Sequence, residues 1–259
     1  TSLFWQVLSK HRKVDILTFG EREEFNKMSD FFSNQISEAP NLNVLEHLFL
    51  MIIWFFMLHL CFRCYQKRWV HIVFWWLQFI QIVSLYTWYI VADSPLSESL
   101  PFYHCRLAML FILWAKPGPL KRYFAYLGLF GSLAAFIHPV FDPFAFPHLT
   151  FFTFVIGHYA LTVNCMLYLL SDLEGEMLKG KEVVKYTLIM NMLILGVALL
   201  TGGNYGFLRQ APLVNTNNLP LNFFLVTCLL CFSILSIQAM LIAYLKKESK
   251  QMNSHILKK

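Results

Sequence analysis

Charged side chains are scarce in this sequence. Of its 259 residues only 14% are charged and 57% are hydrophobic, whereas a soluble domain carries about 25% charged residues. A surface that faces water on all sides therefore cannot be built from this composition. Aromatic residues are abundant instead, at 17% with 26 Phe, which suits a lipid-facing surface with Trp and Tyr at the membrane interfaces.

The formal net charge of +6 does not indicate a nucleic-acid partner. The cations lie in short clusters between apolar runs, which is the usual pattern of the loops that orient membrane helices. We therefore expect no nucleic-acid binding.

The start of the chain, TSLFWQVLSKHRK, is too polar for the apolar core of a signal peptide.

Seven apolar runs predict an all-α fold, a polytopic bundle of about seven transmembrane helices. A hydrocarbon core of about 30 Å needs roughly 20 helical residues. The third run is the shortest and is stopped at Lys116-Pro117-Gly118-Pro119, so it either spans or re-enters the membrane. The runs cover residues 42–62, 69–91, 101–115, 122–140, 149–170, 184–202 and 219–245.

Loop charges favour seven spans. Cationic clusters follow the first, third, fifth and seventh runs, and Arg209 is the only cation after the even-numbered ones. Because cytoplasmic loops carry the excess of Lys and Arg, this alternation predicts the N-terminus outside and the C-terminus inside. We expect a multi-pass protein of the cell membrane, with an interfacial or extramembrane arm at 1–40, the bundle at 41–246 and a basic cytoplasmic tail at 247–259.

Polar side chains from five of the predicted helices and their loops gather near the outer leaflet. Ionisable groups within a span are costly and by default mark a functional cavity. This group consists of Glu46, His47, His104, Cys105, Arg106, His138, Asp142, His148, His158, Asn204, Tyr205 and Arg209.

Three of these residues suit nucleophilic catalysis. Cys105 would attack as a thiolate, which a helix N-terminus and the neighbouring Arg106 favour and apolar surroundings oppose. His158, or else His138, would be the general base. Asn204, or else the backbone N–H groups after Gly202-Gly203, would stabilise an oxyanion. The substrate-binding residues would be His104, Arg106, His138, Asp142, His148, Tyr205 and Arg209.

Simpler roles compete with this chemistry. A single membrane Cys such as Cys105 is usually a small apolar filler. His158 can hydrogen-bond a backbone group or water, and Arg106 can reach lipid phosphates at the interface. His138 and His148 lie among prolines, where they would cap an ordered loop.

Metal binding is a weaker interpretation. Suitable ligand types are present, but no H-x-x-x-H or H-E-x-x-H spacing occurs. Two C-x-x-C pairs, Cys61/Cys64 and Cys228/Cys231, fall at depths about 20 Å apart, against Zn–S bonds of about 2.3 Å. We expect no metal and no cofactor.

Four stretches resemble the YwaF-like family of bacterial membrane proteins, in matching order and spacing over about residues 40–245. The first has His-Cys where that family's P-x-H-x-C-type segment has a different spacing. The stretches are PFYHCRLAML (101–110), YLGLFGSLAAFIHP (126–139), FPHLTFFTFVIGHYAL (146–161) and GGNYGFL (202–208).

The resemblance extends to function. The YwaF-like family is itself similar to eukaryotic multi-helix phospholipid acyltransferases and lipid-ester hydrolases. It implies that Cys105 carries the acyl group, that His158 is the functional histidine, and that the partner is a membrane phospholipid or lysolipid. Because fold-level analogy does not establish function, a non-enzymatic lipid- or solute-binding protein, or a transporter component with partners in the cell envelope, stays open.

Overall fold

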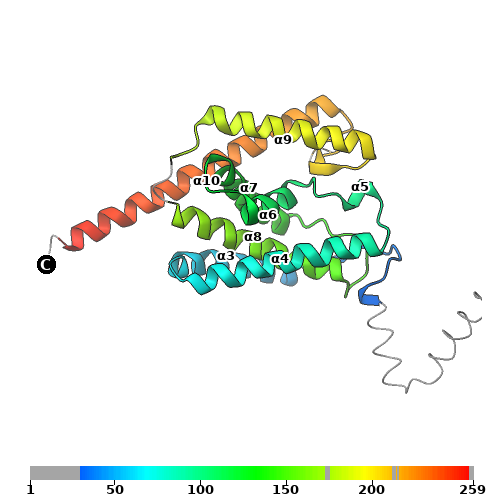
Figure 1. The fold of residues 1–259 in the computed structure, drawn as a ribbon, viewed down its shortest axis with the longest axis horizontal. Helices are drawn as coiled ribbons and strands as arrows, with labels where there is room; N and C mark the ends of the chain where they lie inside the picture. The colour runs from blue at the N-terminus through cyan, green and yellow to red at the C-terminus, as the bar shows by residue number, and fades with distance from the viewer. Residues whose placement is uncertain (1–29, 173–175, 212–213, 215, 257–259) are drawn as a thin grey trace, which may run out of the picture.

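The computed structural model describes residues 30–172, 176–211, 214 and 216–256, with side chains described up to residue 247. Most of the predicted N-terminal arm, residues 1–29, lies outside the described residues. The described part is helical and contains no strand (Figure 1). Its elements are α3 (Val44–Cys64), α4 (Arg68–Val91), α5 (Leu96–Ser99), α6 (His104–Trp114), α7 (Pro119–Ile137), α8 (Leu149–Ser171), α9 (Gly180–Thr201), the 3-10 helix η1 (Tyr205–Phe207) and α10 (Leu219–Ile256).

The predicted all-α membrane bundle is confirmed. Within the described residues, five helices are long and apolar enough to cross a membrane, namely α3, α4, α8, α9 and α10. The other two predicted spans form helices of 11 residues in α6 and 19 residues in α7. An 11-residue helix rises only about 16 Å, so α6 is too short to span a membrane on its own. Length and composition together support five of the seven predicted spans.

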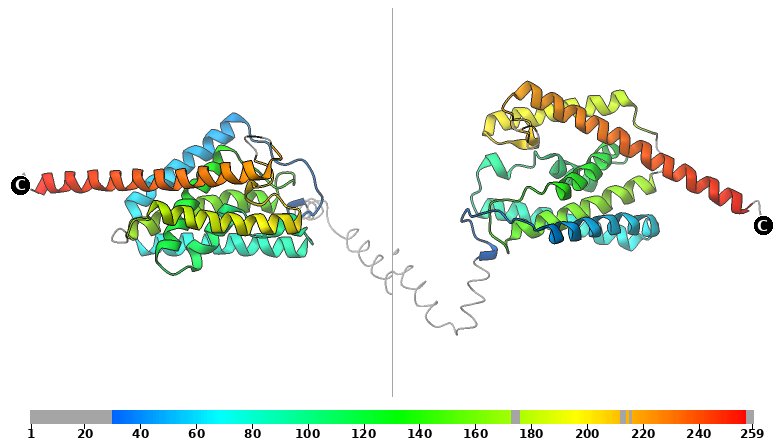
Figure 2. Two further views of the ribbon diagram at one scale, coloured as in Figure 1. Left: turned by 90° about the horizontal axis from the view of Figure 1, so that it is seen from above. Right: turned by 180° about the vertical axis from the view of Figure 1, so that it is seen from behind.

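Helices α7 and α8 form the centre of the bundle. Helix α8 packs against α3, α4, α6 and α7, and α7 also contacts α9 and α10. Figures 1 and 2 show α3 and α4 on one side of this centre and the α9–α10 pair on the other. Helix α3 exposes large apolar side chains such as Ile52 and Phe55, as expected of a helix that faces lipid.

Local signals in the sequence set the helix ends. Asn43 accepts hydrogen bonds from the backbone N–H groups of Leu45 and Glu46, and Glu46 accepts one from the Asn43 N–H. This capping box starts α3. Pro119 begins α7, where its missing N–H costs nothing. Gly202 ends α9 in the left-handed conformation, with φ of 78°.

Helix α10 is longer than the seventh apolar run. It has 38 residues and continues to Ile256, so its backbone is helical through most of the predicted tail at 247–259. Figure 1 shows this helix projecting well past the bundle.

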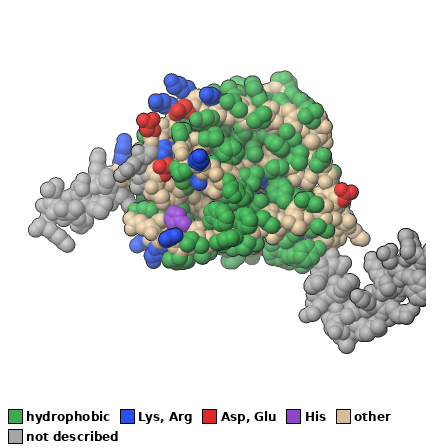
Figure 3. Space-filling model, in the orientation of Figure 1, with side chains coloured by type: hydrophobic (Ala, Val, Ile, Leu, Met, Phe, Trp, Pro, Cys, Tyr) green, Lys and Arg blue, Asp and Glu red, His purple; other side chains and the backbone are tan. Residues whose placement is uncertain are grey.

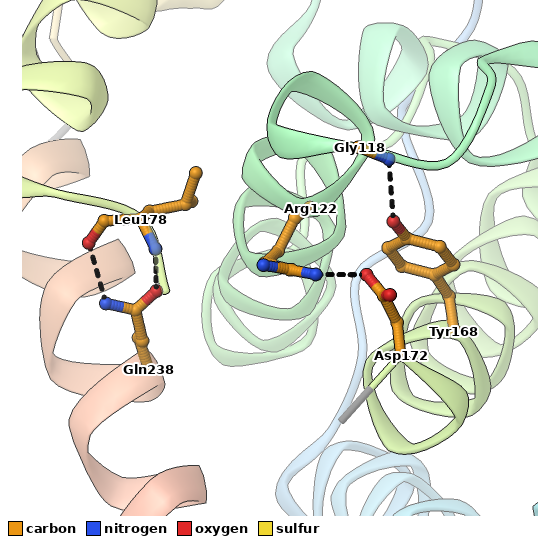
Figure 4. A network of polar contacts seen from close by, with 6 residues as sticks. All are labelled: Gly118, Arg122, Tyr168, Asp172, Leu178 and Gln238. Atoms are coloured by element: carbon orange, nitrogen blue, oxygen red, sulfur yellow. Dashed lines mark hydrogen bonds and ion pairs between the residues drawn. The ribbon is translucent and has the colours of Figure 1, made fainter. Parts of the chain in front are cut away.

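A group of polar contacts closes the end of the bundle where α7 begins and α8 ends (Figure 4). Arg122, which is 6% exposed, forms an ion pair with Asp172. The Gly118 N–H donates to the Tyr168 hydroxyl over 3.3 Å. These contacts fix the start of α7 against the end of α8.

A separate pair of hydrogen bonds joins the start of α9 to α10. The Gln238 amide accepts from the Leu178 N–H at 3.0 Å and donates to the Leu178 carbonyl at 3.1 Å (Figure 4). On the face drawn in Figure 3, Lys and Arg side chains gather toward the same end of the molecule, while apolar side chains cover the middle. A charged end next to an apolar band is the surface expected of a membrane bundle.

Candidate functional site

The thiol of Cys105 lies where α6 meets the central helix α7. Cys105 is the second residue of α6 and is partly buried against the core. Its Sγ lies beside Gly131 of α7, so close that a Cβ on that glycine would be 2.7 Å from the sulfur. The thiol therefore faces a packed helix interface.

His158 lies in the middle of α8 and is 8% exposed. Its Nδ1 is 2.7 Å from the carbonyl oxygen of Phe154, one turn earlier. Since a carbonyl can only accept, Nδ1 carries the hydrogen, and in the neutral ring the lone pair is on Nε2. This is the tautomer that a general base acting through Nε2 requires.

The structure brings Cys105 and His158 to the same helix. The thiol contacts Gly131, and the His158 ring packs against Phe136 with ring centroids 6.1 Å apart. Positions 131 and 136 are about 7.5 Å apart along a helix axis and about 140° apart around it. Contact with the same helix therefore does not by itself bring the two side chains together, and among the described residues no hydrogen bond joins them.

Hydroxyl groups connect the surroundings of His158 to α7 and α3. Thr162 Oγ1 lies 2.8 Å both from Ser132 Oγ and from the His158 carbonyl oxygen. The Trp54 indole N–H also donates to Ser132 at 3.4 Å. None of these residues was predicted as a site residue; Ser132 was expected only on a small-residue face of the fourth run that packs closely against another helix.

Arg106 is held by a polar cluster next to the start of α6. Its guanidinium donates to the Tyr89 hydroxyl at 2.6 Å and to the Glu98 carbonyl at 3.2 Å, and it stacks over the rings of Tyr89 and Tyr103. Tyr89 in turn donates to Asp142 at 3.0 Å. The predicted substrate-binding residues Arg106 and Asp142 therefore belong to one cluster.

Glu98, on α5, borders this polar cluster. The Tyr103 hydroxyl donates to the Glu98 carboxylate at 3.3 Å, while burial raises the pKa of Glu98. Partial burial therefore favours the neutral form of this carboxyl group.

His104 points away from this cluster, toward α9. Its Nε2 lies 2.8 Å from the Asn191 amide oxygen, and the Asn191 amide donates to the Thr227 hydroxyl at 2.9 Å. The chain of bonds links α6, α9 and α10. Asn191 and Thr227 were not predicted as site residues, because each is one of several polar residues scattered through a long apolar run.

Asn204, Tyr205 and Arg209 stabilise the loop after α9. The Asn204 side chain donates to the Gln210 carbonyl at 2.9 Å and accepts from the N–H groups of Arg209 and Gln210. The Tyr205 hydroxyl donates to the Leu96 carbonyl at 2.5 Å and accepts from the Leu100 N–H at 2.9 Å. The Arg209 guanidinium donates to the Gly202 carbonyl at the end of α9.

This loop also borders a cavity between the end of α9 and the start of α10. Its volume is about 420 Å³, which is enough for part of a lipid head group or a small solute. The residues lining it are Leu199, Gly202, Asn204, Arg209, Gln210, Asn217 and Leu219.

The two remaining predicted histidines end up in different places. His138 is exposed at the end of α7. His148 is buried and caps α8, with Nδ1 accepting from the Thr150 N–H at 3.2 Å and Nε2 2.9 Å from the Ser33 carbonyl. Burial lowers the pKa of His148.

A family model describing the TMEM164 family matches residues 32–244. The chain belongs to the TMEM164 family. No curated protein and no solved structure matches it.

In this TMEM164 family member the matched region takes in the whole candidate site, from α3 to the part of α10 that packs on the bundle. Among the described residues, no group of three or more His, Cys, Asp or Glu side chains is placed to hold a metal ion.

Proposed function

We propose that this TMEM164 family member is a lipid acyltransferase or lipid-ester hydrolase of the cell membrane that works through Cys105 and His158. The main support is that a thiol and an imidazole with a free Nε2 pack against one central helix of a membrane protein. The resemblance to YwaF-like proteins, and through them to phospholipid acyltransferases, points to the same two residues.

The reaction would proceed in two steps. His158 Nε2 takes the thiol proton as the sulfur attacks the ester carbonyl of a phospholipid, and the C–O bond to the glycerol oxygen breaks. The imidazolium returns that proton to the departing lysolipid. An acceptor hydroxyl, or water, then attacks the thioester while His158 takes its proton, and the thiol is restored when that proton returns to sulfur.

We propose that this chemistry takes place at the outer leaflet. Lys and Arg gather toward one end of the face in Figure 3, and a cation-rich end faces the cytoplasm. The polar cluster of Arg106, Tyr89 and Asp142 lies at the start of α6 and the end of α4, which is the opposite end of α4 from the cationic Lys67–Arg68 start.

Acyl exchange in vesicles tests the proposal. The full chain is reconstituted with a phospholipid that carries an isotope-labelled acyl chain and with an unlabelled lysophospholipid, and transfer is followed by mass spectrometry. We expect Cys105→Ala to abolish transfer and His158→Gln to reduce it by about 10²-fold or more, the usual contribution of a general base. Intact-protein mass should show an acyl adduct on Cys105 that hydroxylamine removes.

Cys228→Ala is the matched control, since Cys228 is an exposed cysteine on α10. It should leave both transfer and the adduct unchanged. Undiminished transfer by the Cys105→Ala protein would end the thiol mechanism.

The cavity beside Arg209 supports a second candidate, a non-enzymatic binder of lipid or solute that serves a cell-envelope partner. In that case native mass spectrometry should find an intact lipid bound without an adduct. Arg209→Ala should then weaken binding of an anionic lipid, whereas Cys105→Ala should not.

A further inference from the structure

Two glycines of α7 lie against two thiols. A Cβ on Gly131 would lie 2.7 Å from Cys105 Sγ, and a Cβ on Gly128 would lie 2.5 Å from Cys165 Sγ. Carbon and sulfur do not approach this closely without displacement of one of them, because protein interiors are already close-packed. Each glycine therefore makes room for one sulfur atom, one turn apart along the same helix.

The crowding at Gly131 is confined to the sulfur. The next nearest atoms to a Cβ there are the Cα and Cβ of Cys105, both at 3.9 Å, an ordinary contact distance. An added methyl group would thus leave the backbone of α6 in place and force the thiol to turn about χ1. The sulfur would therefore move to another staggered χ1 state.

We propose that Gly131 is a positioning residue for Cys105, holding its thiol in the orientation from which it attacks an acyl ester. This inference rests on the proposed function. A thiol in another χ1 state would approach the ester carbonyl from a different direction. Misplacement of a reacting atom by about 1 Å can cost about 10²-fold in rate. Gly131 touches the reacting sulfur but takes no part in bond making itself.

Gly128 supplies a matched control on the same helix. Its added methyl would crowd Cys165 Sγ at 2.5 Å and also the Leu161 side chain at 2.9 Å. Cys165 and Leu161 are both fully buried in α8. The Gly128→Ala change should therefore damage packing more than Gly131→Ala, and none of the three atoms nearest to its added methyl group belongs to Cys105.

The test compares Gly131→Ala and Gly128→Ala in the full chain, reconstituted in the acyl-exchange vesicles described above. We expect Gly131→Ala to lose at least tenfold in transfer rate with a small fall in Tm. We expect Gly128→Ala to keep its rate within about twofold despite a larger fall in Tm. The variant with the smaller fall in Tm would then show the larger loss of rate. That result would assign the rate loss to orientation of the thiol and not to loss of packing.

A spectroscopic measurement reports on the thiol without any substrate. The infrared S–H band of Cys105 is identified as the band that disappears in Cys105→Ala. Gly131→Ala should shift that band, and Gly128→Ala should shift the band that disappears in Cys165→Ala. In the Cys105→Ala background Gly131→Ala should no longer lower Tm, since the crowded sulfur is gone.

Three outcomes would overturn the inference. These are a Gly131→Ala rate within twofold of the unchanged protein, an unshifted Cys105 band, and an unchanged Tm penalty when Cys105 is already Ala. If Cys105→Ala itself still transfers acyl chains, the proposed function fails, and the band and the Tm comparison still decide whether Gly131 orients the thiol.

Discussion

The imidazole of His104 and the side-chain amide of Asn191 are joined by a hydrogen bond of 2.8 Å between Nε2 and Oδ1. Because Asn191 is fully buried and also donates to Thr227, this one amide ties α6 to both helices of the α9–α10 pair. Hydrogen bonds between membrane helices contribute about 0.6 kcal/mol each and up to about 2 kcal/mol.

Replacing Asn191 by Leu should therefore be destabilising. Both partners would lose their bonds inside the protein, and we expect the free energy of unfolding to fall by about 1–3 kcal/mol. Thermal unfolding in detergent measures the change. Leu193→Ala on the exposed face of the same helix is the control and should be nearly neutral; equal losses in the two variants would contradict the role given to Asn191.

The ion pair between Arg122 and Asp172 should couple the ends of α7 and α8. The two side chains are 7% and 27% exposed. Breaking the pair should therefore lower the free energy of unfolding by an amount between the roughly 1 kcal/mol of exposed pairs and the roughly 3–5 kcal/mol of buried ones. A double-mutant cycle with Arg122→Met and Asp172→Asn, read by denaturant unfolding, measures the coupling. Additive single changes would show that the pair contributes nothing.

The His148 cap should make stability depend on pH. The neutral ring accepts from the Thr150 N–H, which a protonated ring cannot do. Burial lowers the pKa of the folded-state ring, so as the pH falls the unfolded chain takes up its proton first, near pH 6.5. The stabilisation is therefore present above about pH 6.5 and is lost as the pH falls toward the lower folded-state pKa.

His148→Asn isolates this effect, because Asn is a good N-cap that does not titrate. Its Tm should decline less steeply than that of the unchanged protein between about pH 7 and pH 5. Identical slopes in the two proteins would mean that His148 does not contribute to the pH dependence.

Arg106 should not tolerate replacement by lysine. Its planar guanidinium bonds Tyr89 and the Glu98 carbonyl at once and stacks on Tyr103. A lysine ammonium lacks that flat, forked geometry. We expect Arg106→Lys to cost about 1–3 kcal/mol of stability, measured by thermal unfolding. Arg63→Lys at an exposed position should change little, and a harmless Arg106→Lys would contradict the bidentate role.

Hydropathy predicted the bundle well because apolar runs depend on composition alone, but it misplaced some helix ends. The third run was expected from residue 101, yet α6 begins at His104. The Leu100 N–H is taken by the Tyr205 hydroxyl, from a residue more than one hundred positions away. Such a tertiary contact keeps the preceding segment extended and leaves no local signal.

Arg122 shows the converse error. It was expected to be the first residue of the fourth apolar run, whereas α7 begins earlier, at Pro119, and buries Arg122 against Asp172. The sequence shows that both residues are charged but does not show that they meet. The same holds for Gly131 and Cys105, whose contact depends on how α6 crosses α7.

The catalytic roles predicted for Cys105 and His158 stay predictions. Cys105 and His158 were selected because they were expected to lie among the polar side chains near the outer leaflet. The structure packs the Cys105 thiol and the His158 ring against α7. Asn204 was expected beside them as an oxyanion donor, but its side chain bonds within its own loop. A polar side chain at a loop finds backbone partners nearby, and the residue type alone cannot distinguish that role from catalysis.

The length of α10 has a mechanical consequence. A continuous helix of 38 residues extends about 57 Å, so some 27 Å of it cannot fit within a hydrocarbon layer of about 30 Å. The helix runs from the rim of the Arg209 cavity to well beyond the far side of the bundle as a single rod. A tilt imposed on its protruding part would therefore act as a lever on the packing at that cavity.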